Sequence, residues 1–320
     1  MKVCIAAKSG DWSAATTGKG FFAARLAAEM KSLGAKVTAD TSEKVDVALH
    51  IGHIHYKSHA RKDVLRLGPA RVSTHENMSK LNAAKAKSVK IADGIVFQSE
   101  YSRRVMRKFV AKPPRKSTVV YNGVNYDWYD ECVAAKDLPH KVVFVASTRK
   151  WIPQKRLKDV VLSFKAADIK DSALYVLGNP LEFNHKKHGA DNIHFAGNCD
   201  QIEIASYLKA ATAMVHAVYL DACPNSVVEA IGAKAPVVCT DQGGTVELLK
   251  GWNYIAVQDK PFAWKPVNLA KPPRIDHTVM AGALRMAAET KWGECDRPER
   301  CDIGVVANNY LQFFEEVLDG

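Results

Sequence analysis

The fold is decided by the stretch Asp221-Ala222-Cys223-Pro224-Asn225-Ser226-Val227-Val228-Glu229-Ala230, followed by Pro236-Val237-Val238-Cys239-Thr240 and Gly243-Gly244-Thr245-Val246-Glu247-Leu248. It places two acids eight residues apart, Asp221 before a proline turn and Glu229 in the first turn of a predicted helix. The start of that helix, at Asn225 and Ser226, offers backbone N–H groups and a positive dipole end, which suit a diphosphate. The alternative is a capping box, in which Ser226 caps the helix and Glu229 only closes its start.

Short apolar runs alternate with helical patterns on both sides of this stretch. In the first half, the sequence predicts strands at residues 3–7, 35–39, 45–51, 70–74, 95–98 and 118–121, and helices at 21–33, 79–92 and 101–109. In the second half, it predicts strands at 142–146, 173–177, 193–196, 213–217 and 237–240, and helices at 157–166, 202–210 and 226–233. Alternating strands and helices with short connections are typical of parallel, doubly wound α/β sheets.

The pattern divides the chain into two α/β domains. Residues 131–140 lose the alternation and contain Pro139, so they read as a linker between a domain at 1–135 and a domain at 136–300. Residues 251–300 are poorly periodic, and an amphipathic helix is expected at 303–318. We expect this last segment, 301–320, to pack back on the N-terminal domain. Two such domains face each other across a cleft at the carboxyl ends of their strands, where these folds bind ligands.

Composition and charge narrow the class of protein. Of the 320 residues, 47% are hydrophobic and 25% are charged, which excludes a disordered chain, a fibre and a small disulfide-stapled protein. No apolar run approaches the roughly 18 residues of a membrane span. The net charge is +11, but residues 1–130 hold 23 Lys and Arg against 11 Asp and Glu, a net of +12. This basic half indicates an anionic partner, such as nucleic acid or an acidic membrane surface, or serves solubility alone.

Cysteine and histidine usage give no strong metal signal. The seven cysteines are an odd number without any C-x-x-C pair, which favours free thiols in a reducing compartment and therefore a cytoplasmic location. His50, His53, His55 and His59 form an H-x2-H-x-H-x3-H cluster whose alternatives are a metal site and a structural role. We expect no metal.

The two-acid stretch resembles the E-x7-E region of family 4 glycosyltransferases, which are retaining GT-B enzymes that use nucleotide sugars. Asp221 stands where the first Glu is usual, so the motif here is D-x7-E. Residues 143–156 are similar to the opening of that family's C-terminal domain. In the first half, residues 91–102, 119–125 and 72–76 resemble further family stretches, and the likeness covers most of residues 15–250.

The resemblance implies a role for each matching residue. Arg149 and Lys155 would hold the donor diphosphate, with Asn225 and Ser226 at the helix start, and Glu229 would bind the ribose hydroxyls. Asp221 and His75 would act at the donor sugar, and Gly18 and Gly20 would form a turn close to the diphosphate. The implied donor is a UDP- or GDP-sugar, and the family's transfer needs no metal or other cofactor.

The sequence therefore predicts a retaining, metal-free hexosyltransferase of GT-B architecture whose basic N-terminal domain meets the acceptor. The alternative is a nucleic-acid-binding protein, or a DNA-modifying glycosyltransferase, that uses the same basic domain. The candidate anion-binding residues lie on two predicted helices: Lys80, Lys85, Lys87 and Lys90, then Arg103, Arg104, Arg107 and Lys108. If the anionic partner is a bilayer, the enzyme lies peripherally on a membrane.

Overall fold

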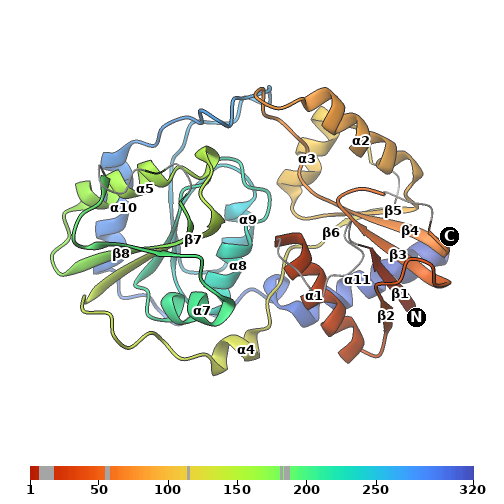
Figure 1. The fold of residues 1–320 in the computed structure, drawn as a ribbon, viewed down its shortest axis with the longest axis horizontal. Coiled ribbons are helices and arrows are strands. Elements are labelled where there is room, and N and C mark those ends of the chain that lie inside the picture. The colour runs from red at the N-terminus through yellow and green to blue at the C-terminus, as the bar shows by residue number, and fades with distance from the viewer. Residues whose placement is uncertain (7–17, 55–57, 114–115, 181–182, 184–187) are drawn as a thin grey trace. The chain divides into compact units, whose positions relative to one another are not determined.

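The computed structural model describes residues 1–6, 18–54, 58–113, 116–180, 183 and 188–320, which form two compact units (Figure 1). The first unit contains Met1–Val124 and Glu299–Gly320, and the second contains Asn125–Pro298. The structure thus divides the chain at residue 124 rather than at the linker expected near 135. The reason is α4 (Tyr126–Glu131), which packs against a helix of the second unit, α8 (Asn225–Gly232).

The first unit is a six-stranded parallel sheet with helices on both faces. Its strand order is β2-β1-β3-β4-β5-β6. The strands are β1 (Lys2–Ala6), β2 (Lys36–Thr38), β3 (Val45–Ile51), β4 (Ala60–Leu67), β5 (Gly94–Phe97) and β6 (Ser117–Val119). The helices are α1 (Gly18–Ser32), α2 (Met78–Ile91), α3 (Glu100–Phe109) and α11 (Ile303–Leu318).

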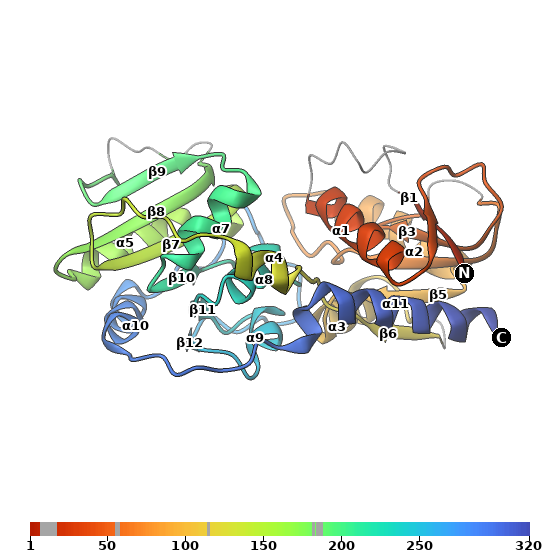
Figure 2. The same cartoon turned by 90° about the horizontal axis from the view of Figure 1, so that it is seen from below.

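Helix α11 belongs to the core of this first unit, although it comes from the end of the chain (Figure 2). It packs against α1, and its Tyr310 and Phe314 are fully buried in the same apolar cluster as Phe22. A side chain at position 94 would collide with α11, because a Cβ on Gly94 would lie 2.7 Å from Val317. Right-handed crossovers place α2 and α3 together on the opposite face of the sheet.

The strand predicted at residues 70–74 is wrong, because the structure places β4 at Ala60–Leu67 and leaves only a bridge at Ser73. The sequence Ala-Arg-Lys-Asp-Val-Leu-Arg-Leu hides this strand, since its charged side chains interrupt the apolar pattern. Arg66 is nevertheless buried, with its guanidinium carbon 3.8 Å from the centre of the Phe22 ring. A strand that contains buried charged side chains does not show the apolar run by which strands are recognised in a sequence.

The second unit repeats the architecture with the strand order β12-β11-β10-β7-β8-β9, again all parallel. Its strands are β7 (Val142–Lys150), β8 (Ser172–Asn179), β9 (Ile193–Gly197), β10 (Ala213–His216), β11 (Val237–Thr240) and β12 (Tyr254–Val257). Its further helices are α5 (Leu157–Ala167), α7 (Gln201–Lys209), α9 (Thr245–Leu249) and α10 (His277–Glu289), with the 3-10 turn η1 (Pro153–Lys155). A second 3-10 turn, η2 (Glu299–Cys301), begins the return to the first unit.

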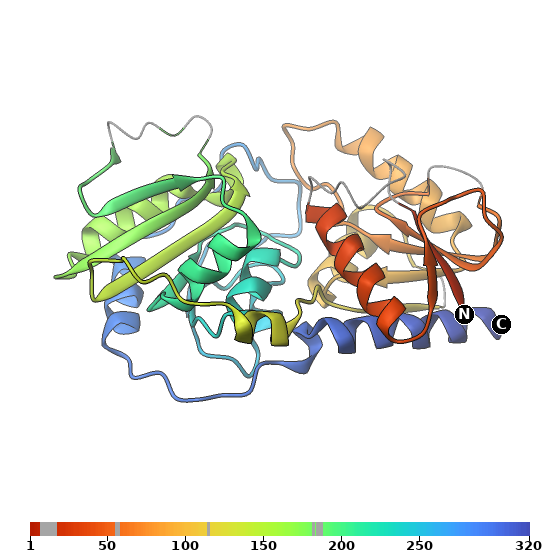
Figure 3. The ribbon, with the colours of Figure 1, turned by 60° about the horizontal axis from the view of Figure 1, so that its bottom comes forward.

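Helices α5 and α10 pack together on one face of the second sheet, over a core that includes Phe144, Val215 and Leu284 (Figure 3). Helices α7 and α8 contact each other on the other face. The region 251–300, where the sequence predicted no regular elements, contains β12 and α10. Two parallel sheets with flanking helices confirm the predicted α/β, doubly wound fold class.

None of the seven cysteines is paired in a disulfide. Within the described ranges, no helix combines the length and the apolar character that crossing a membrane requires.

Candidate functional site

The second sheet has its switch point between β7 and β10. The chain runs from β7 to β8 and β9, and then returns to the other side of β7 with β10. Ligands of open α/β sheets bind outside the carboxyl ends of the strands at such a point. The segments that leave these two strands carry Lys155 and Asp221, so two of the predicted residues follow the two strands that flank the switch point.

Lys155 ends the 3-10 turn that follows β7, and its side chain is half-buried. Its Nζ donates a hydrogen bond to Oγ1 of Thr148, at the end of the same strand. Burial lowers the pKa of Lys155, while the nearby carboxylate of Asp221 raises it. Among the described residues, the Thr148 hydroxyl is the one hydrogen-bond acceptor of this ammonium, which therefore keeps N–H donors for an anionic ligand.

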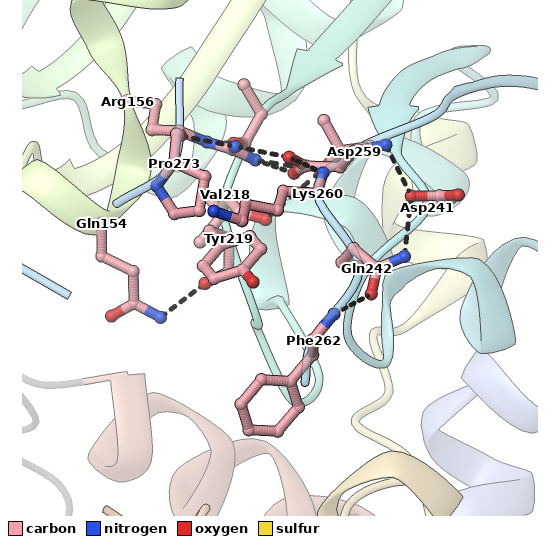
Figure 4. A network of polar contacts seen from close by, with 12 residues as sticks. Gln154, Arg156, Val218, Tyr219, Asp241, Gln242, Asp259, Lys260, Phe262 and Pro273 are labelled. Atoms are coloured by element: carbon pink, nitrogen blue, oxygen red, sulfur yellow. Dashed lines mark hydrogen bonds and ion pairs between the residues drawn. The ribbon is translucent and has the colours of Figure 1, made fainter. Parts of the chain in front are cut away.

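The backbone beside Lys155 is held by Arg156, which adopts a left-handed conformation with φ of 55°. Its guanidinium forms a buried pair with Asp259, with nitrogen–oxygen distances of 2.5 and 3.1 Å (Figure 4). Its Nε donates to the carbonyl of Ala217 at 2.6 Å, and a terminal nitrogen donates to the carbonyl of Pro273 at 3.2 Å. A left-handed non-glycine residue costs about 1–3 kcal/mol and persists only where the surroundings enforce it.

The Lys155 turn is also joined directly to the segment that leads to Asp221. Gln154 donates from its side chain to the carbonyl of Tyr219 at 2.8 Å and accepts from the Tyr219 amide at 3.1 Å (Figure 4). Further along the same edge of the sheet, Asp241 accepts the amide of Asp259 at 2.9 Å. Four loops of the second unit, near residues 154, 219, 241 and 259, therefore form one hydrogen-bonded network.

The position of Asp221 is set by backbone conformation and backbone hydrogen bonds. The residue before it, Leu220, has φ of 60°, and the carbonyl of Asp221 accepts the amide of Gly244 at 2.7 Å. Its Oδ1 accepts the amide of Cys223 at 3.2 Å. Burial raises the pKa of Asp221, and the positive charge of Lys155 opposes that shift. The two side chains thus act on each other electrostatically across the switch point.

Gly243 allows this close approach, since its φ is 101° and a Cβ there would lie 2.5 Å from the Asp221 carbonyl oxygen. We expect Gly243→Ala to lower the free energy of unfolding by about 1–3 kcal/mol, because it combines a strained φ with a backbone collision. Urea denaturation measures the loss. Gly282→Ala is the matched control, because Gly282 lies within α10 with nothing within 4 Å of its Cβ position. The control is expected to be neutral or slightly stabilising; equal losses in both variants would contradict the prediction.

Helix α8 begins at Asn225, after Pro224 in the N-cap position, and no side chain caps it. The capping-box alternative for Ser226 and Glu229 is therefore wrong. The amides of Val227 and Val228 both turn back to the carbonyl of Pro224, at 3.2 and 3.3 Å. Asn225, Ser226 and Glu229 are all half-buried and lie within the first five positions of the helix. The helix start thus retains the dipole and backbone character that favour an anion.

Arg149 is exposed near the end of β7, where the pairing with β8 shifts register between Ser147 and Lys150. Such irregularities redirect a side chain and often lie beside functional sites. On the neighbouring strand, Gly178 has φ of 100°, and a Cβ there would lie 1.5 Å from the Thr148 carbonyl oxygen. The close backbone approach at Gly178 fixes the end of β7 from which Arg149 and the Lys155 turn extend.

His216 was not singled out from the sequence. It ends β10 and is buried, and its Nε2 has no hydrogen-bond partner among the described residues. Burial lowers its pKa to about 3, with further lowering by the charges of Lys155 and Arg156. A single histidine at the end of a strand forms no sequence pattern. The sequence alone therefore does not show that His216 is buried close to Lys155 and Arg156.

The lowered pKa of His216 predicts a pH dependence of stability. Unfolded His216 takes up its proton near pH 6.5 and the folded form only near pH 3, so the unfolded state binds more protons between these values. Stability from this group is complete above pH 6.5 and falls as the pH drops; the raised pKa of Asp221 opposes part of the fall. We expect His216→Gln to flatten this slope in urea titrations, whereas His59→Gln, at an exposed site, leaves it unchanged. A wild-type slope in His216→Gln would contradict the assignment.

Three further predicted residues belong to the first unit. His75 is exposed in the turn before α2, and its Nδ1 bonds to Oγ of Ser73. Gly18 and Gly20 lie in the first turn of α1, and the preceding residues 7–17 are outside the described part of the chain. The structure therefore groups Lys155, Asp221 and the α8 start in one unit and leaves His75 and the two glycines in the other.

The histidine cluster after β3 forms no metal site within the described residues, where no three metal-binding side chains converge. His50 is buried and bonds through Nε2 to Oδ1 of Asp63 at 2.7 Å, which in turn accepts from Ser58 at 2.6 Å. Burial alone would raise the pKa of Asp63, but the hydrogen bonds from His50 and Ser58 hold that pKa below its usual value. His55 lies outside the described residues.

Comparisons with known proteins show what the chain is similar to. Residues 139–269 match the family model described as glycosyl transferases group 1. The chain has the GT-B fold. Sucrose-phosphate synthase from Thermosynechococcus elongatus is similar over 99% of this chain and 95% of its own, with 13% identity and a TM-score of 0.69. An Anabaena protein, HepE, in complex with UDP-glucose is similar over 99% and 100%, with 13% identity and a TM-score of 0.65.

A glycosyltransferase from Rickettsia africae is similar over 100% of this chain and 99% of its own, with 14% identity and a TM-score of 0.60. No curated protein matches the sequence. The matched group 1 domain contains Lys155, Asp221 and Glu229 and indicates a glycosyltransferase.

Proposed function

We propose that the protein is a retaining glycosyltransferase that moves a hexose from a UDP- or GDP-sugar to an acceptor hydroxyl without a metal ion. The observation that carries the proposal is that Lys155 and Asp221 follow the two strands that flank the switch point of the second sheet, in the same unit as the start of α8, which has no side-chain cap. UDP-glucose, bound by the similar Anabaena protein, is one donor of this class.

In this proposal the second unit neutralises the leaving group. Lys155 and Arg149 bind the diphosphate, together with the backbone at Asn225 and Ser226, because charge on the phosphate grows as the glycosidic bond breaks. Glu229, on the same helix, accepts hydrogen bonds from the ribose hydroxyls. The hydrogen bond between Gln154 and Tyr219 holds the turn that carries Lys155 in position before the donor binds. Because the turn is already in place, less reorganisation is needed during the reaction.

The transfer breaks the bond between the sugar C1 and the diphosphate oxygen and forms a bond from C1 to the acceptor oxygen on the same face. The acceptor proton passes to the departing phosphate, so no protein base is required. Asp221 orients the donor sugar in the second unit; for His75, Gly18 and Gly20 of the first unit, the roles that the family resemblance implies stay predictions. The free thiols fit a cytoplasmic enzyme.

Hydrolysis and transfer assays with a panel of UDP- and GDP-sugars test the proposal, and Glu229→Gln separates ligand binding from helix stability. The substitution removes a charge-assisted hydrogen bond, so we expect nucleotide affinity to fall roughly 10-fold with little change in Tm. Lys158→Gln, at an exposed site on α5, is the control. Unchanged affinity in Glu229→Gln would overturn the ribose assignment, and inactivity with every donor would overturn the proposed reaction.

A second candidate function is nucleic-acid binding or DNA glycosylation, favoured by exposed cations on one face of the first unit. The basic surface consists of Lys80, Lys87 and Lys90 of α2 and Arg104, Arg107 and Lys108 of α3. Two residues of the predicted surface do not contribute in full: Lys85 is buried and donates to the Gly68 carbonyl at 3.2 Å, and Arg103 pairs with Glu100 at 3.3 Å.

Salt titration separates the partners that this basic surface allows. Binding to duplex DNA should weaken steeply with salt, because each neutralised phosphate releases counterions. Binding to vesicles of anionic lipid, measured in parallel, tests the alternative that the protein lies on a membrane. Each basic residue near such a surface is expected to contribute about 1 kcal/mol of binding free energy. Absence of binding to both at low salt would leave a neutral acceptor.

A further inference from the structure

Two arginines are buried in the described part of the chain, Arg156 and Arg66, and only Arg156 has a carboxylate partner there. Arg156 has a carboxylate partner, Asp259, and donates five hydrogen bonds in total. Arg66 is 2% exposed and makes one hydrogen bond, to Oδ1 of Asn122, besides its contact with the Phe22 ring. Within the described residues, Arg66 forms no ion pair, and its buried Nε has no hydrogen-bond partner. A guanidinium keeps its positive charge at any working pH, and a buried charge without a counter-ion is costly.

Arg66 lies at the carboxyl edge of the first sheet, the edge at which open α/β sheets bind their ligands. It is the second-last residue of β4, and Asn122 follows β6, so both lie at the carboxyl edge of the first sheet. The ring that Arg66 covers belongs to Phe22, near the start of α1. One turn further along α1, Arg25 donates to the carbonyl of Gly123 at 3.3 Å. Two guanidiniums therefore meet the turn at residues 122–123, at the carboxyl edge of the first sheet.

We propose that Arg66 and Asn122 form a binding site for a phosphate group in the first unit, with the guanidinium fork as the main donor. A planar guanidinium presents paired N–H groups that match phosphate oxygens, and the side-chain amide of Asn122 can turn to donate as well. The phosphate belongs either to a nucleotide or to a phosphorylated acceptor. The site goes beyond the proposed function, because it lies in the unit that lacks Lys155 and α8.

The test uses the full chain and inorganic phosphate, with sodium chloride at equal ionic strength as reference. Phosphate at about ten times its dissociation constant should raise the Tm of the wild type by roughly 3–6 °C. In Arg66→Met the Tm without phosphate should be unchanged or higher, because an unpaired buried charge is gone, and the phosphate shift should be lost. Arg61→Met, on the exposed part of the same strand, should keep the shift.

Two further variants keep the test decisive. Arg66→Lys retains the charge without the fork and should show a smaller shift, which covers the case in which Arg66→Met fails to fold. Lys155→Met removes the cation proposed for the diphosphate in the other unit, so the phosphate shift that remains in it reports the Arg66 site and should disappear in the double variant Arg66→Met/Lys155→Met. An equal shift in wild type and both Arg66 variants, or no shift in the wild type, would overturn the proposal. A shift that Lys155→Met removes and Arg66→Met retains would overturn it as well.

Titration with UDP then distinguishes the two sources of phosphate. If Arg66 binds a nucleotide phosphate, Arg66→Met should weaken UDP binding at least 10-fold. If it contacts a phosphorylated acceptor, UDP affinity should be unchanged while the response to inorganic phosphate is lost. Failure of UDP to bind wild type would count against the proposed function and leave the phosphate test intact.

Discussion

Lys155→Met should lower kcat/KM for sugar transfer roughly 10- to 150-fold, in a protein that remains folded. A charge-assisted hydrogen bond is worth about 1.5–3 kcal/mol, and this one is expected to strengthen as charge develops on the leaving phosphate. The loss should therefore appear in kcat as well as in KM. Stability should change little, since the buried ammonium pays a desolvation cost that already lowers its pKa.

The same substitution at Lys158, three residues along the chain and exposed on α5, is the control and should leave kcat/KM unchanged. The pH profile provides a second measurement. The lowered pKa of Lys155 means that its proton is lost at a lower pH than that of an ordinary lysine, so activity should fall on the alkaline side earlier than expected for an unperturbed lysine. Near-wild-type transfer by folded Lys155→Met would contradict its assignment to the diphosphate.

The sequence predicted most of the second unit because its strands are continuous apolar runs. β10 and β11 are buried at every position, and the proline and glycine residues between them mark the turns. The first unit was predicted less well at β4, whose charged residues mask the strand. In the region 251–300, α10 was missed although it is capped by Asp276, because its many alanines give a weak apolar stripe.

Candidate site residues were predicted only where the signal was local. The spacing of Asp221 and Glu229 lies within one strand–turn–helix unit, so the sequence displays it directly. The partners that shape the site are far apart: Arg156 and Asp259 are separated by 103 residues, and Gln154 and Tyr219 by 65. Nothing in a single sequence distinguishes the exposed Arg149 from the buried Arg66, since burial depends on which strands become neighbours.

Asp259→Ala should be among the most destabilising single substitutions in the second unit. It removes a carboxylate that is fully buried and leaves Arg156, 1% exposed, without its counter-ion. Breaking a buried ion pair from one side costs about 3–5 kcal/mol. For a unit of this size, that corresponds to a fall in Tm on the order of 10 °C, measurable by calorimetry.

The double variant Arg156→Met/Asp259→Leu tests the cause of this loss. If the unpaired charge is responsible, replacing both partners with apolar side chains should restore much of the stability that Asp259→Ala loses. Lys234→Met, which breaks only the exposed pair with Asp130 at 2.9 Å, should cost about 1 kcal/mol or less. Because Arg156 directly follows Lys155, the double variant should regain Tm but not full nucleotide affinity. Recovery of both would show that the buried pair serves stability alone and does not position Lys155.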